Sequence, residues 1–257
     1  MIKLSTENLK LLPKPNDLQN LCKSISALEA IISPDWEDRY YSYQKDWSDS
    51  EEFCEMRNGQ GDKMLILFSE AGTCINGFAH ESEMNGWKNR SIKVKKTFLG
   101  KFFNSTEELK TELIQEIPQG VLTGLPKAFD EFVFGEPVKS IGTTFCIWNT
   151  KTNTDWKTGE INLPKNEYKD GSEDLLNLLD GNPVTYKKWA EEYYEEEFEN
   201  RELKIELVEK IYSGTTISKE LVLEINPNLE DFDLLWSNLS EIGYEIKKPV
   251  GNRVYNQ

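Results

Sequence analysis

The sequence predicts an α+β protein with a mixed or antiparallel sheet, and three observations lead to this prediction. A short segment containing glycine separates two apolar runs, at 63–69 and 73–80, as is typical of an antiparallel hairpin. Apolar residues recur every three or four positions near both ends of the chain, which indicates helices. The 257 residues are 38% hydrophobic, which is enough apolar material to bury a core without disulfides.

The first expected element is a helix from about residue 17 to 32. One face of this helix carries Leu18, Leu21, Cys22, Ile25, Leu28 and Ile32. Ser33 precedes Pro34, and a residue before proline avoids helical backbone angles, so the helix should end there. The aromatic stretch 36–47 fits an edge strand or an extended loop, and residues 51–57 fit a strand or a short helix.

A hairpin of two strands, at 63–69 and 73–80, is expected at the centre of the sheet, after a glycine-rich turn at 58–62. Because side chains alternate along a strand, the apolar ones of the first strand should divide between the two faces. One face should carry Met64, Ile66 and Phe68, and the other Leu65 and Leu67. A strand that is apolar on both faces should be central and covered on each side.

The middle of the chain contains weaker signals. A capping-box spacing of serine and glutamate predicts a helix over 105–117, closed by the proline that follows. A short helix is expected around 125–132 and a strand at 143–148. The polar residues 149–170 predict a long loop.

The last third of the chain is mainly helical in pattern. Ser172 and Thr185 are each placed to cap a short helix. Residues 203–225 fit either a strand or a helix. A helix from about 227 to 242 has a clear apolar stripe and ends at Gly243, after which a final short strand is expected.

The chain is acidic, and its charge is unevenly distributed. Thirty basic and 45 acidic residues give a formal net charge of −15. Residues 1–100 carry 13 basic and 15 acidic groups, whereas residues 170–245 carry six and 20. We therefore expect a sheet-containing α+β part at 1–165 and an acidic, mainly helical lobe at 166–257, either as two domains or within one.

This acidity restricts the classes of partner. A negative field repels nucleic acids and anionic membranes, and it attracts a basic protein. The simplest interpretation is that the acidity only keeps the protein soluble. The N-terminus lacks a basic stretch followed by an apolar core, and no apolar run reaches the roughly 18 residues of a membrane helix, so we expect a cytoplasmic protein.

No cofactor or metal is expected from the sequence. The four cysteines are widely spaced and form no CxxC pair. They lie in apolar stretches, which predicts reduced core residues. A zinc site is disfavoured because only one histidine is present to complete a ligand set.

One candidate site is a group of polar residues around the predicted hairpin: Arg39, Arg57, Asp62, His80, Glu81 and Ser82. His80 is the only histidine, and it stands where a strand should end, as catalytic groups often do. The turn at 58–62 lacks the Gly-Lys-Ser/Thr of a phosphate loop. The structural interpretation is a turn braced by polar contacts. The functional one is an enzyme with a site around His80, Arg57 and Asp62.

A second candidate site is the acidic segment near residue 195. Its residues are Glu191, Glu192, Tyr193, Tyr194, Glu195, Glu196, Glu197 and Phe198. Like charges at helical spacing repel, so this segment costs some helix stability. A solvated face is the plain interpretation. The alternative is a docking surface for a basic protein, with the aromatic side chains as anchors.

Four segments resemble a family of bacterial cytosolic proteins whose motifs have no assigned chemistry. They are Asp38–Tyr43, Trp47, Met56–Asp62 and Gly77–Ser82. Some of these proteins look like immunity proteins of toxin systems. The resemblance implies a non-catalytic inhibitor that masks a basic protein partner, and it assigns no catalytic residue. An enzyme and a regulatory or scaffold protein are the alternatives.

Overall fold

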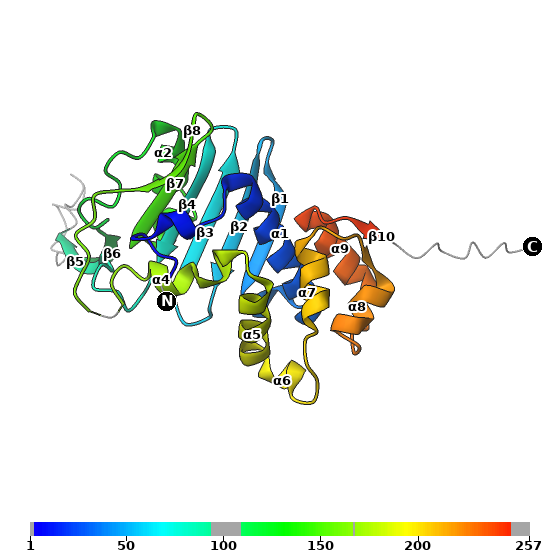
Figure 1. The fold of residues 1–257 in the computed structure, drawn as a ribbon. Helices are drawn as coiled ribbons and strands as arrows, with labels where there is room; N and C mark the ends of the chain where they lie inside the picture. Colours follow the sequence, from blue (N-terminus) through cyan, green and yellow to red (C-terminus); the bar gives the residue numbers. More distant parts are fainter. Residues whose placement is uncertain (1–2, 94–108, 167, 248–257) are drawn as a thin grey trace, which may run out of the picture.

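A six-stranded antiparallel sheet forms the centre of the protein, with the strand order β1-β2-β3-β4-β7-β8 (Figure 1). The computed structural model describes residues 3–93, 109–166 and 168–247. The sheet strands are β1 (Tyr41–Ser48), β2 (Glu51–Arg57), β3 (Lys63–Ser69), β4 (Gly72–Phe78), β7 (Phe145–Thr150) and β8 (Asn153–Thr158). The predicted α+β class and the central antiparallel hairpin are confirmed.

Helices cover one face of this sheet. The α-helices are α1 (Pro15–Ile32), α2 (Asp130–Phe134), α3 (Val138–Ile141), α4 (Ser172–Leu175), α5 (Pro183–Tyr193), α6 (Glu195–Phe198), α7 (Ile205–Tyr212), α8 (Lys219–Ile225) and α9 (Phe232–Ile242). Short 3-10 helices are η1 (Leu9–Leu11), η2 (Trp36–Asp38), η4 (Lys127–Phe129) and η5 (Asn177–Asp180). Helix α1 contacts β1 on one side and α7 and α9 on the other (Figure 1). One hydrophobic cluster therefore continues from the sheet through α1 into the acidic helices.

The opposite face of the sheet is covered only in part. Met64 and Ile66 belong to the core on the α1 side, whereas Leu65 and Leu67 belong to clusters on the other face, as the alternation in β3 predicts. The segment that contains α2 and α3 packs over β3, β4 and β7. Over β1 and β2 this face carries half-buried polar side chains and the buried Phe53, which packs with Val138 of α3. The sheet is thus exposed toward its β1 edge.

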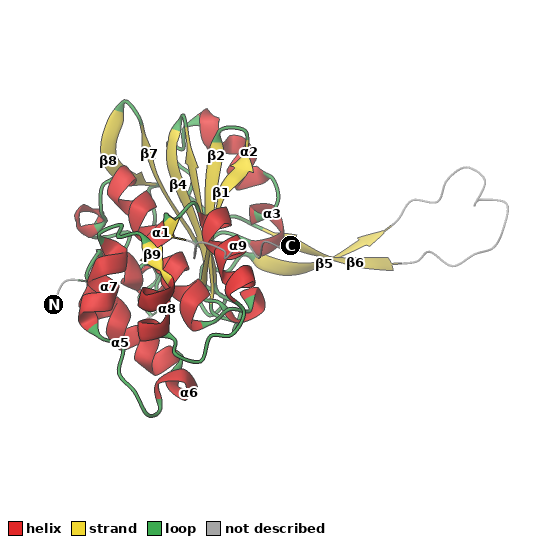
Figure 2. Cartoon of the chain, turned by 90° about the vertical axis from the view of Figure 1, so that its right-hand side faces the viewer, coloured by secondary structure: helices red, strands yellow, loops and turns green. Residues whose placement is uncertain are grey.

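A separate hairpin, which follows β4 and precedes β7 in the sequence, projects from the sheet (Figure 2). It consists of β5 (Trp87–Lys93) paired antiparallel with β6 (Leu109–Gln115). The helix predicted over 105–117 is therefore wrong, because pairing with β5 outweighs the local helical pattern. The expected capping box, Ser105 and Glu108, lies outside the described residues.

Other predicted elements need smaller corrections. The loop expected at 149–170 contains β8, a short polar edge strand. Residues 203–225 form α7 and α8, joined by β9 (Ile217–Ser218), which pairs in parallel with β10 (Ile246–Lys247).

Three helices begin at a residue other than the one predicted, and the first is α4, where Gly171 is the N-cap and Ser172 is the first helical residue. Asn182, and not Thr185, caps α5, because its side chain accepts the Val184 N–H at 3.0 Å. Helix α9 begins after Asp231, which accepts the Leu234 N–H at 2.8 Å, and not near residue 227. The caps of α5 and α9 are Asn or Asp side chains, which accept such bonds readily.

All four cysteines are free and buried in the core, as predicted. Cys74 Sγ and Cys146 Sγ lie 3.7 Å apart across β4 and β7. Burial raises the pKa of both Cys54 and Cys74, which keeps these thiols protonated. No helix in the described part of the chain is both long and apolar enough to cross a membrane.

Candidate functional site

The strand register gathers part of the predicted polar cluster at one end of the sheet. Arg57 ends β2 and pairs with Lys63, which pairs in turn with Phe78 at the end of β4. Asp62 immediately precedes β3, and His80 follows β4 by two residues. The six predicted residues separate into two groups, one around His80 and one around Arg57.

Asp62 and His80 form a braced acid–base pair. Asp62 Oδ1 accepts the backbone N–H of His80 at 2.8 Å and lies 2.7 Å from its Nδ1. Asp62 Oδ2 accepts a bond from Asn58 Nδ2 at 2.9 Å. Because a carboxylate only accepts, Nδ1 carries the proton and Nε2 is left as the basic nitrogen. The His80 side chain is 39% exposed, and Glu81 Oε1 lies 3.8 Å from Nε2.

Ser82 has a structural role beside this pair. Its hydroxyl donates to the Lys169 carbonyl at 2.6 Å and accepts the Met84 N–H at 3.0 Å. Both contacts hold the loop after β4 in place. The hydroxyl does not point at His80 as a nucleophile would.

The second group joins the two arginines to Trp36. The Arg57 guanidinium lies over the Trp36 indole, 3.7 Å from its ring centre. Arg57 also donates to the carbonyls of Arg39, at 3.3 Å, and of Trp36. Arg39 is buried and donates to the carbonyls of Ser33, at 2.9 Å, and Pro34. Trp36 itself remains 51% exposed.

A buried carboxylate fixes the aromatic side chains next to this group. Glu29 on α1 is fully buried, and it accepts hydrogen bonds from the hydroxyls of Tyr186, at 2.8 Å, and Tyr194, and from the Tyr40 N–H at 3.0 Å. Burial raises the pKa of Glu29, and the tyrosine hydrogen bonds oppose that shift. These bonds tie α5 and α6 to α1 and to the start of β1.

Tyr193 rests on this network and is still 41% exposed. Its ring stacks on Trp189 with centres 4.9 Å apart and meets Tyr40 edge-on at 5.1 Å. Burial and the carboxylates of Glu29 and Asp38 raise the pKa of Tyr193, and Arg57 opposes them. Arg57 is thus stacked on Trp36 and near enough to Tyr193 to act on its pKa, and we call these three residues the Trp36–Tyr193 surface.

The predicted acidic docking residues do not form one continuous helix. Helix α5 ends at Tyr193, and Tyr194 has non-helical angles, φ −104° and ψ 44°, before α6 begins. Phe198 is buried in the core under Arg201 and is not available as an anchor. Glu191 pairs with Lys187 at 2.9 Å and accepts the Leu203 N–H at 2.8 Å.

Four exposed glutamates remain around Tyr193, namely Glu192, Glu195, Glu196 and Glu197. None of them has an ion-pair partner within the described ranges. Arg201 offsets part of the charge of Glu197, but the group as a whole remains negative beside Tyr193 and projects a negative field. The structure thus reduces the predicted anchors to Tyr193 and adds Trp36.

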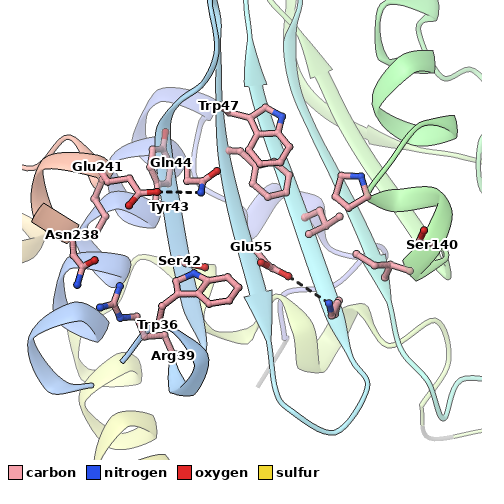
Figure 3. Close-up of a pocket in the computed structure, with 16 residues that line it drawn as sticks. Trp36, Arg39, Ser42, Tyr43, Gln44, Trp47, Glu55, Ser140, Asn238 and Glu241 are labelled. Carbon is pink, nitrogen blue, oxygen red and sulfur yellow. Dashed lines mark hydrogen bonds and ion pairs between the residues drawn. The ribbon is translucent and has the colours of Figure 1, made fainter. Parts of the chain in front are cut away.

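A groove of about 370 Å³ opens on the uncovered face of β1, β2 and β3 (Figure 3). Its floor consists of the outward-facing side chains Ser42, Gln44, Phe53, Glu55, Lys63 and Leu65. Helix α3 forms one wall, and the last turn of α9 forms the other. Trp36 lies at one end, and Trp47, which stacks on Phe53 with centres 4.4 Å apart, lies at the other.

Sequence reasoning missed this groove. The alternation of Tyr41 and Tyr43 with polar residues could have indicated that the other face of β1 is not packed in a core. The walls come from segments about 100 and 200 residues downstream, and no local pattern predicts that they meet here. Neither this groove nor the two other described cavities is lined by Asp62, His80, Glu81 or Ser82.

No group of three or more potential metal ligands gathers anywhere in the described residues. Comparison with known protein families, with curated proteins and with solved structures finds no match to this chain. The function is therefore inferred from the surface itself.

Proposed function

We propose that this protein is a non-catalytic protein-binding protein, an immunity-type inhibitor that masks a basic protein partner. One observation carries the proposal. Two half-exposed rings, Trp36 stacked on Arg57 and Tyr193 nearby, adjoin four exposed glutamates that have no ion-pair partner in the described chain. Trp, Tyr and Arg are the side chains that most often dominate binding energy at protein interfaces.

The arrangement suits rapid and specific capture. Tyr193 is stacked on Trp189, and Trp36 lies under the Arg57 guanidinium, so little side-chain freedom is lost on binding. The glutamates attract a basic partner and raise the association rate, with a strong dependence on salt. Masking then follows from occlusion, because the partner's basic surface is covered.

The electrostatic part is tested by neutralising the four glutamates together, as E192Q, E195Q, E196Q and E197Q. The control neutralises four exposed glutamates elsewhere, as E206Q, E209Q, E224Q and E230Q, for the same change in net charge. We expect the native protein and the control to retain a basic protein from the source cell at low salt but not at high salt. The test variant should associate roughly tenfold more slowly, measured by surface plasmon resonance.

Tyr193→Ala tests the anchor. It should weaken the same complex by at least about 30-fold, as expected when a central aromatic anchor is truncated. If the native protein retains no basic protein at low salt, or if both sets of glutamate variants slow association equally, the proposal is wrong.

A second candidate function is an enzyme that uses Asp62 and His80 as an acid–base pair. The observation that favours it is the braced geometry, in which Asp62 contacts Nδ1 and the imidazole stays partly exposed. His80→Ala should then reproduce the phenotype of a gene deletion, whereas Tyr193→Ala should not. The opposite pattern would eliminate the enzyme and leave the binding protein.

A further inference from the structure

The groove of Figure 3 adjoins the Trp36–Tyr193 surface but is a different feature. Trp36 borders both, and from there the groove follows the strands to Trp47. The β1 residues that line the groove run from Ser42 to Trp47, which at about 3.3 Å per residue makes the groove roughly 20 Å long. That length matches five or six residues of an extended peptide.

The groove has apolar side chains prepared for a bulky group. Trp47 is 43% exposed although it is stacked on Phe53. Leu65 on the floor and Ile141 in the α3 wall face the same space. Large exposed aromatic side chains at a concave site are typical of a surface that another molecule covers.

The charges in the groove favour a basic occupant. Two cations and two carboxylates line it, but the cations are already engaged. Arg39 is buried and bonded to backbone carbonyls, and Lys63 lies 3.6 Å from Glu55. The exposed carboxylate of Glu241 accepts a hydrogen bond from the neutral Gln44 at 3.1 Å and acts on the buried Arg39 through its charge, and it has no ion-pair partner among the residues that the structure describes.

We propose that the groove receives an extended segment of the basic partner that carries one bulky apolar and one basic side chain. The inference rests on the proposed function and extends it to a second contact. The apolar side chain packs against Trp47 and Ile141, and the basic one pairs with Glu241. Because Trp36 borders both features, one partner can cover the Trp36–Tyr193 surface and the groove together.

The probe is a synthetic eight-residue peptide of alternating arginine and leucine, compared with the same peptide carrying glutamate in place of arginine. Binding is followed by NMR at the indole N–H groups of the seven tryptophans. The basic peptide should shift the Trp36 and Trp47 signals, and the acidic peptide should shift neither. Equal binding of both peptides, or shifts confined to other tryptophans, would overturn the inference.

Two matched pairs of variants locate the site. Trp47→Ala and Glu241→Lys should each weaken binding of the basic peptide at least about tenfold. Leu11→Ala and Glu230→Lys, which change an exposed apolar and an exposed acidic residue outside the groove, should bind like the native protein. The assigned site would be contradicted if Trp47→Ala weakened binding no more than Leu11→Ala, or if Glu241→Lys weakened it no more than Glu230→Lys.

The same variants separate this inference from the proposed function. A captured basic protein that is lost with Tyr193→Ala but kept by both groove variants would refute the groove and leave the proposed function intact. If Trp47→Ala and Glu241→Lys also abolish capture of the basic protein, the proposed function and the groove inference are both supported. If the basic peptide binds the groove while no basic protein is captured, the proposed function fails separately.

Discussion

Glu29 shows how one side chain can organise a surface from inside the core. It lies on the apolar stripe of α1, four residues after Ile25, where a charged residue is unusual. Burying a carboxylate is tolerated only when hydrogen bonds satisfy it, and two tyrosine hydroxyls and a backbone N–H do so. The cost of burial is thus offset by contacts that fix α5 and Tyr194.

Removing one of those hydroxyls should destabilise the protein. Tyr186→Phe leaves a lone pair of Glu29 without its donor, so the free energy of unfolding should fall by about 1–3 kcal/mol in urea titrations. Tyr41→Phe is the matched control, because the buried Tyr41 hydroxyl has no hydrogen-bond partner among the described residues. That variant should be neutral or slightly stabilising. An equal loss in the two variants would contradict the role of Glu29.

Single residues differed in how well the sequence revealed them. Asp62 and His80 could be predicted to lie together because each adjoins a strand of the same hairpin, so strand pairing determines their distance. Glu29 was not singled out, although it is a charged residue on an apolar stripe, because its tyrosine donors lie about 160 residues away. Trp36 and Tyr193 lie far apart in the sequence, and their proximity to Arg57 depends on how α5 packs on α7 and is held to α1 by Glu29.

At the scale of elements, local patterns succeeded where the element makes its own contacts. Helix α1 and strands β3 and β4 have long periodic signals, and their bounds lie within two residues of the predicted ones. The sequence did not predict strands β6 and β8, because their stability comes from pairing with β5 and β7 and not from their composition. A contact distant in sequence also breaks the acidic segment at Tyr194. The hydrogen bond from its hydroxyl to Glu29 outweighs continuation of the helix.

Helix α4 is joined to the sheet end near His80 by a glycine contact. Gly171 has φ +80°, and a Cβ there would lie 2.1 Å from the Ala79 Cβ. Gly214 has a similar φ of +77° with open space around it. Gly214→Ala should lower the free energy of unfolding by about 1 kcal/mol through backbone strain alone. Gly171→Ala should lose a further 1–3 kcal/mol or so from overpacking, and equal losses by urea unfolding would refute this contact.

Across the whole molecule, the distribution of charge indicates two parts of the chain, whereas the hydrophobic core is shared between them. The negative charge is concentrated in residues 170–245, which favours an acidic lobe separate from the sheet. The hydrophobic core shows no such division, because α1 packs on β1 and also on α7 and α9. Net charge determines solubility and steering of partners, whereas shared apolar burial determines what unfolds together. The acidic helices therefore share one continuous core with the sheet, and their negative charge belongs to the surface.

A continuous core should unfold as one unit. Leu239 in α9 and Ile75 in β4 are both fully buried in the cluster that includes α1. Each alanine substitution should cost about 2–5 kcal/mol, and hydrogen exchange measured segment by segment should speed up by the same factor in β3–β4 and in α7–α9. Two independent lobes would respond differently, because Leu239→Ala would speed exchange only in the C-terminal helices and Ile75→Ala only in the sheet. That outcome would restore the two-domain division at residue 165.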